Sequence, residues 1–144
     1  MNLPGNNNIK DIPVRVENAE DYSIGNLRAL LAEIAAHLER LAGNGTAASI
    51  DLNSLPFAPG EYDQLRQLLG QGEVTAQVEA IGPSEIIETR YPGVWWVTHY
   101  NVEGDIVADT LEIAEIPQIL KSQHDDVRTG LELLRAQLND EVPQ

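Results

Sequence analysis

Residues 90–99, with the sequence RYPGVWWVTH, decide how this chain is expected to fold. Pro92-Gly93 is a turn signal, and a run typical of a strand follows it directly. Side chains alternate across a strand, so the neighbouring Trp95 and Trp96 must point to opposite faces of a sheet. Only one of the two tryptophans can therefore lie in a core on a given face of the sheet.

The chain around this stretch predicts four strands in close succession. They lie at about residues 73–80, 84–91, 94–101 and 105–113, with turn signals at Gly82-Pro83, Pro92-Gly93 and Glu103-Gly104. Links as short as these join antiparallel neighbours, so the strands are expected to form a meander.

The turns also predict which residues face one another. A turn at Pro92-Gly93 places Thr89 opposite Trp96 and Arg90 opposite Trp95. The following turn places Leu111 opposite Trp96 and Glu112 opposite Trp95. The face expected in the core is mostly apolar: Val74, Val78, Ile87, Tyr91, Val94, Trp96, Tyr100, Val107, Leu111 and Ile113. The other face is polar with an apolar centre: Thr75, Gln77, Glu79, Ile86, Glu88, Arg90, Trp95, Val97, His99, Thr110 and Glu112. A slip of one residue would exchange the two faces.

Helices are expected before and after the strands. The first has a 3.6-residue apolar period and ends at residues 43–45, and a second runs from near Pro59 to residues 70–72. A short extended piece at residues 50–52 separates them. After a helical turn at Pro117, Asp125 or Asp126 can cap a last helix. The apolar faces of the three helices are Leu27, Leu30, Leu31, Ile34, Leu38 and Leu41; Tyr62, Leu65, Leu68 and Leu69; and Val127, Leu131, Leu134 and Leu138.

This order of elements predicts an α+β fold, with a four-stranded antiparallel meander sheet and helices packed on one face. The chain has 144 residues, which suits one hydrophobic core. Residues 1–20 are rich in Asn, Pro and acidic groups without apolar periodicity, so we expect a loose N-terminal arm. Residues 21–140 are then a single domain.

The charge of the chain excludes several classes of partner. Nine Lys and Arg against 23 Asp and Glu give a net charge of −14, which would repel nucleic acid and an anionic membrane surface. There is no apolar stretch of roughly 18 residues and no secretory signal, so a cytoplasmic location is expected. The absence of cysteine excludes thiolate chemistry and iron–sulfur ligation by this chain.

Sequence motifs for catalysis, cofactor binding or metal binding are absent, and we predict no residue for any of these roles. His124-Asp125-Asp126 resembles a ligand cluster for a hard metal, but acidic residues are also typical of a helix N-terminus, which explains them better. His37 is expected on the flank of the first helix. His99 shares a strand face with Trp95 and could act as an acid or base, although a surface position is the simpler interpretation.

Trp95 has two competing interpretations. In the first it forms a partner-binding patch with Arg90, Val97, His99 and Ile86, because an aromatic side chain flanked by arginine is typical of binding hot spots. In the second it is covered by a helix or by the N-terminal arm. Pairing of two copies through this face is a third possibility.

Two runs resemble a known family: Gly82-Pro83-Ser84-Glu85-Ile86, and residues 88–99 with the sequence ETRYPGVWWVTH. They are similar to the conserved C-terminal domain of HupH/HyaF-type hydrogenase expression and formation proteins. Further matches extend the resemblance over about residues 25–138. They are Ile50-Asp51-Leu52, Leu55-Pro56, residues 69–74 and Ile116-Pro117.

The resemblance implies a non-catalytic, chaperone-like accessory factor in maturation of an uptake nickel–iron hydrogenase. Its expected partner is the small, Fe–S-carrying subunit or its precursor before export, with a thioredoxin-like maturation protein as a further partner. Many relatives are longer than this chain. The alternatives are a homo-oligomeric interaction domain, or an enzyme that uses His99 with Glu88 or Glu112.

Overall fold

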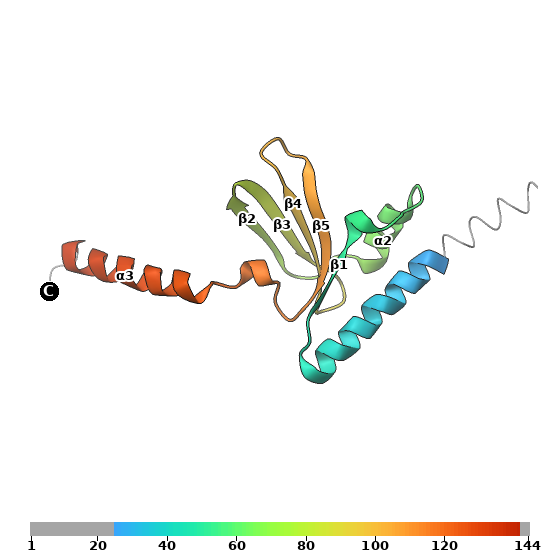
Figure 1. The fold of residues 1–144 in the computed structure, drawn as a ribbon, viewed down its shortest axis with the longest axis horizontal. Helices are drawn as coiled ribbons and strands as arrows, with labels where there is room; N and C mark the ends of the chain where they lie inside the picture. Colours follow the sequence, from blue (N-terminus) through green and yellow to red (C-terminus); the bar gives the residue numbers. More distant parts are fainter. Residues whose placement is uncertain (1–24, 142–144) are drawn as a thin grey trace, which may run out of the picture.

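The computed structural model describes residues 25–141, so the predicted arm at residues 1–20 lies outside the described residues. A first helix occupies residues 25–44 and leads into strand β1 (Figure 1). The elements that follow are β1 (Ala48–Asp51), the 3-10 helix η1 (Leu52–Ser54), α2 (Glu61–Leu69), β2 (Thr75–Ala80), β3 (Gly82–Glu88), β4 (Val94–Tyr100), β5 (Ile106–Ile113), the 3-10 helix η2 (Gln118–Leu120) and α3 (His124–Glu141).

The strands form one antiparallel sheet in the order β1-β5-β4-β3-β2. The α+β class and the meander of β2 to β5 are as predicted, but the sheet has a fifth strand. The short extended piece pairs with the edge of β5, where Ile50 lies opposite Leu111. Its partner lies about 60 residues further along the chain, so no local turn signal could announce the pairing.

The hairpin of β3 and β4 has a longer loop than predicted. Trp96 lies opposite Ile87, and Trp95 opposite Glu88, so the predicted partners Thr89 and Arg90 are wrong by two residues. The loop closes where the Thr89 amide donates to the Val94 carbonyl at 3.0 Å. A two-residue shift keeps each side chain on its face, and therefore the predicted separation of the tryptophans survives.

The turn between β2 and β3 is shorter than predicted and lies earlier in the chain. Ala80 pairs with Gly82, so Ile81 alone forms the turn, and Gly82 already belongs to β3. Gly82 has φ +81°, and a Cβ there would lie 2.1 Å from the Tyr100 carbonyl oxygen, so only glycine fits. Val78 consequently lies opposite Ser84, on the face of Trp95 rather than in the predicted core of Trp96. Three further residues predicted for that core are exposed: Val74 ahead of β2, Tyr91 in the hairpin loop and Val107 at the bulge of β5.

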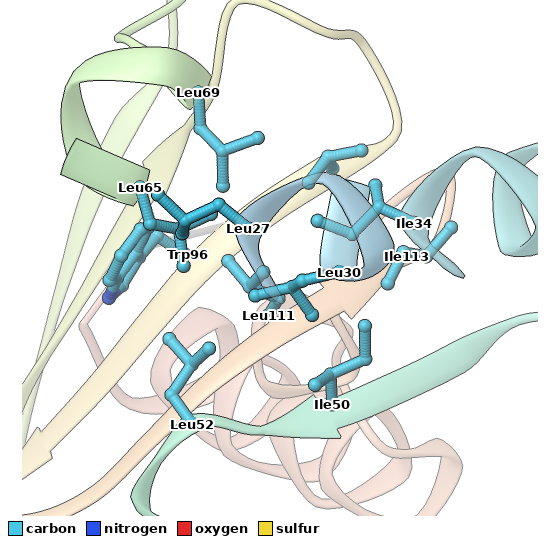
Figure 2. Packing of buried hydrophobic residues seen from close by; sticks show 11 residues of the cluster. Leu27, Leu30, Ile34, Ile50, Leu52, Leu65, Leu69, Trp96, Leu111 and Ile113 are labelled. Atoms are coloured by element: carbon cyan, nitrogen blue, oxygen red, sulfur yellow. The ribbon is translucent and has the colours of Figure 1, made fainter. Parts of the chain in front are cut away.

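The main core lies between the Trp96 face of the sheet and two helices, the first helix and α2 (Figure 2). Its buried members come from the first helix, β1, η1, α2, β4 and β5: Leu27, Leu30, Ile34, Ile50, Leu52, Leu65, Leu69, Val94, Trp96, Leu111 and Ile113. The hairpin loop also reaches the first helix, because Gly93 packs beside Leu38 and Leu41. The Pro92-Gly93 turn thus contacts the first helix in addition to closing the hairpin.

Helix α3 departs from the predicted packing of all helices on the sheet. It extends away from the sheet after η2 (Figure 1), and none of its residues is buried. It begins at His124, so Asp125 and Asp126 lie inside its first turn and not at the predicted N-cap position. Their negative charge still favours this end of the helix.

Candidate functional site

The predicted patch around Trp95 is covered in this structure. Trp95, Ile86 and Val97 form a second buried cluster, and Trp95 is only 6% exposed. Ile119 and Leu120 of η2 pack on this cluster, and the Trp95 indole Nε1 donates to the Ala114 carbonyl at 3.0 Å. This is the second interpretation of Trp95, with η2 as its cover. Partner contact through these three residues stays a prediction, and it would require η2 to move aside.

The other two residues of the predicted patch are accessible but lie apart. Arg90 is exposed in the hairpin loop, where its guanidinium lies against Gly70 after α2. His99 is half-buried near the far end of β4, with its Nδ1 2.6 Å from the Ser84 hydroxyl oxygen. The structure therefore does not gather the predicted residues into one exposed surface.

The catalytic alternative required His99 to meet Glu88 or Glu112. Both glutamates lie opposite Trp95, which is four residues from His99 along β4, so roughly 13 Å of strand separates them from His99. Glu88 accepts hydrogen bonds from the Glu73 and Val74 amides, at 2.9 and 3.3 Å. The register does not bring the histidine together with either carboxylate.

A buried polar cluster around Asp109 escaped sequence reasoning. One carboxylate oxygen, Oδ1, accepts from Trp96 Nε1 at 2.7 Å and from the Thr98 hydroxyl at 2.9 Å. The other, Oδ2, accepts from the Tyr62 hydroxyl at 2.5 Å. Asp109 is two residues before Leu111 and shares its face, so a lone carboxylate on an otherwise apolar face was the available signal.

The surroundings of this cluster explain its electrostatics. Burial, and then the hydrogen bond to Asp109, raise the pKa of Tyr62 to about 12. The Arg66 guanidinium lies over the Trp96 ring, 4.7 Å from its centroid, and the Tyr62 ring packs edge-on against the same indole. The cluster ties α2 to β4 and β5. It therefore fixes the position of the Trp96 side chain.

One side of α3 carries a row of apolar side chains that no other described residue buries. Val127, Leu131, Leu134 and Leu138 are about half exposed. Their spacing of four, three and four residues places them in one stripe, which is the pattern of a helix that packs along another helix. Contiguous exposed apolar surface of this kind marks interaction sites. The apolar side of this helix is as predicted from the sequence, but the predicted packing of that side on the sheet is wrong.

Neither a metal centre nor a membrane-spanning helix occurs among the described residues. Within residues 25–141, no three His, Cys, Asp or Glu side chains come together in a way that could hold a metal ion. No helix in that range is both long and apolar enough to cross a membrane.

Residues 25–141 thus form a small α+β domain in which the amphipathic helix α3 is not covered by any other described element. The chain belongs to the family described as HupH hydrogenase expression protein, C-terminal conserved region, which residues 24–140 match. This confirms the resemblance carried by the hairpin sequence.

Individual relatives agree with the family. The chain is 34% identical over 106 residues to the hydrogenase expression/formation protein HoxQ of Azotobacter vinelandii, covering 74% of this chain and 37% of that protein. It is 30% identical over 110 residues to HupH of Rhodobacter capsulatus, covering 76% of this chain and 40% of that protein. The solved structure of the hydrogenase expression protein HupH from Thiobacillus denitrificans is similar, with 40% identity and a TM-score of 0.77, over 81% of this chain and 97% of that one.

These matches have a defined extent. The chain spans about two fifths of the length of the curated relatives it matches. These relatives are named as hydrogenase expression/formation proteins.

Proposed function

We propose that this chain is a non-catalytic, chaperone-like accessory factor that binds the Fe–S-carrying small subunit of an uptake nickel–iron hydrogenase in the cytoplasm before export. Family membership supports the hydrogenase context. The exposed stripe of α3 supports binding, because an apolar helix face in water is stabilised when a partner covers it.

The shape of α3 suits a binding role. The helix extends from the domain, so a partner can contact it without disturbing the core (Figure 1). The stripe runs from Val127 to Leu138, which is three turns and roughly 17 Å along the axis. A length of this order matches one helix or one extended segment of another protein.

Co-purification tests the proposal. The full chain, carrying an affinity tag, is produced together with the hydrogenase small-subunit precursor, and the captured precursor is quantified. Leu131→Glu/Leu134→Glu places two charges in the stripe and is expected to lower capture at least tenfold. Thr129→Glu/Ala136→Glu places the same charges on the opposite side of α3 and is the matched control, with capture as in the wild type.

Two results would count against the proposal. One is capture of the precursor no better than by an unrelated acidic protein. The other is full capture by the Leu131→Glu/Leu134→Glu variant, which would separate binding from α3. A thioredoxin-like maturation protein, the further partner that we propose, can be measured in the same preparation.

A further inference from the structure

The charges beside the α3 stripe are arranged unequally. Arg128 and Arg135 lie one helical position after Val127 and Leu134, along one edge of the stripe. The other edge carries Gly130 and Gln137, which are uncharged. Three acidic residues of α3 lie further round the helix: Asp125, Asp126 and Asp140. Glu132 lies one turn from both arginines, beyond the same edge. Glu141, the last residue of α3, follows Leu138 by three positions and accepts a hydrogen bond from Gln137 Nε2 at 3.2 Å. The apolar stripe therefore has one basic edge on a chain whose net charge is −14.

Neither arginine has an acidic partner in the described part of the chain. No carboxylate between residues 25 and 141 lies within 4.0 Å of either guanidinium. Both side chains are exposed on a helix that extends away from the sheet. Two guanidinium groups are thus available beside an apolar surface, where a contact that excludes water strengthens a charge pair.

We infer that the α3 stripe binds an acidic amphipathic helix, with the apolar side of the partner on Val127, Leu131, Leu134 and Leu138 and its carboxylates beside Arg128 and Arg135. This inference rests on the proposed use of α3 as a binding surface and adds the chemistry of the partner. The four-three-four spacing fits a partner helix of about three turns.

A second copy of this chain fits the surface less well. If two α3 helices pair in parallel, the arginine edge of one faces Gly130 and Gln137 of the other. If they pair antiparallel, the two arginine edges face each other and repel. Neither arrangement gives the guanidinium groups a carboxylate, so charge complementarity favours a different, acidic helix.

Two synthetic helical peptides of equal length test the inference with the full chain and no hydrogenase present. Both carry leucine at the heptad positions a and d; one has glutamate at the flanking positions and the other has lysine. We expect fluorescence anisotropy to show at least tenfold tighter binding of the glutamate peptide at 50 mM salt. The difference should shrink at 500 mM salt, because exposed charge pairs are screened.

Charge reversal supplies the control. Arg128→Glu/Arg135→Glu should reverse the preference, so that the lysine peptide binds more tightly. Arg28→Glu/Arg40→Glu makes the same change of charge on the first helix and should leave the preference for glutamate intact. A reversal in both variants would mean that only net charge matters, and the inference would then fail.

Three other results would overturn the inference. They are equal binding of the two peptides, binding of neither peptide, and a solution mass of two copies that returns to one copy in Leu131→Glu/Leu134→Glu. The last would assign the stripe to a homodimer. Because the peptide assay contains no hydrogenase subunit, its failure leaves the co-purification result standing, and the reverse is also true.

Discussion

The first helix and α3 have the same kind of amphipathic pattern and opposite environments. Leu27, Leu30 and Ile34 are 4–8% exposed beneath the Trp96 face of the sheet, whereas the stripe of α3 is 46–56% exposed. Periodicity reports which side of a helix is apolar, and the comparison shows that it does not report what covers that side. In the first helix the cover is the sheet, and for α3 we propose another protein.

The largest expected effect separates these two environments directly. Leu65→Ala removes a fully buried side chain from the covered core and should lower the free energy of unfolding by about 3–5 kcal/mol, because a cavity remains. Leu134→Ala on α3 should change it by less than about 0.5 kcal/mol. Urea unfolding followed by tryptophan fluorescence measures both. Equal losses would mean that α3 is packed in solution.

The next-largest effect tests the Asp109 cluster, which ties α2 to the Trp96 face of the sheet. Asp109→Ala leaves Trp96 Nε1, Thr98 and Tyr62 without their buried acceptor and should cost about 2–4 kcal/mol. The same urea unfolding curves give this value, with Asp105→Ala in an exposed turn as the control. A loss below about 0.5 kcal/mol would show that the cluster contributes little to the packing of α2 on the sheet.

A smaller effect concerns the cover of Trp95. Ile119→Ala/Leu120→Ala removes two half-buried side chains from η2 and should destabilise the fold by about 1–2 kcal/mol. Because Trp96 stays buried under α2, acrylamide quenching should rise for one tryptophan only. Unchanged quenching would show that η2 does not shield Trp95, and rising quenching on addition of a partner would support docking at this face.

The smallest effect is a pH dependence from Tyr62. Its pKa is raised from 10.0 to about 12, so the folded state holds the phenol proton more tightly than the unfolded chain. The contribution of this raised pKa to the free energy of unfolding is fully present below pH 10 and is lost as the pH rises through 12. Unfolding at pH 9, 10 and 11 should show a steeper alkaline loss for the wild type than for Tyr62→Phe. Parallel curves would contradict the assignment.

The tryptophan pair shows how far sequence patterns could predict the fold and the candidate site. Alternation across β4 correctly assigned Trp96 to the main core and Trp95 to the other face. The partners in β3 were wrong by two residues, and the faces of β2 were exchanged. Turn residues identify where a chain reverses, but pairing depends on how many residues the loop uses, and tertiary contacts such as Gly82 with Tyr100 set that number.

Local composition and periodicity alone determined where the helices lie and which of their sides are apolar. They also determined the meander, the excess of negative charge and the hairpin sequence by which the family is recognised. These properties depend on neighbours within a few residues, which the sequence states directly. Only the tertiary structure decided that β1 joins β5, that η2 covers Trp95, that Asp109 meets Tyr62, and that α3 lies uncovered. Each of these depends on contacts between distant segments, and burial is a property of the packed chain rather than of any one segment.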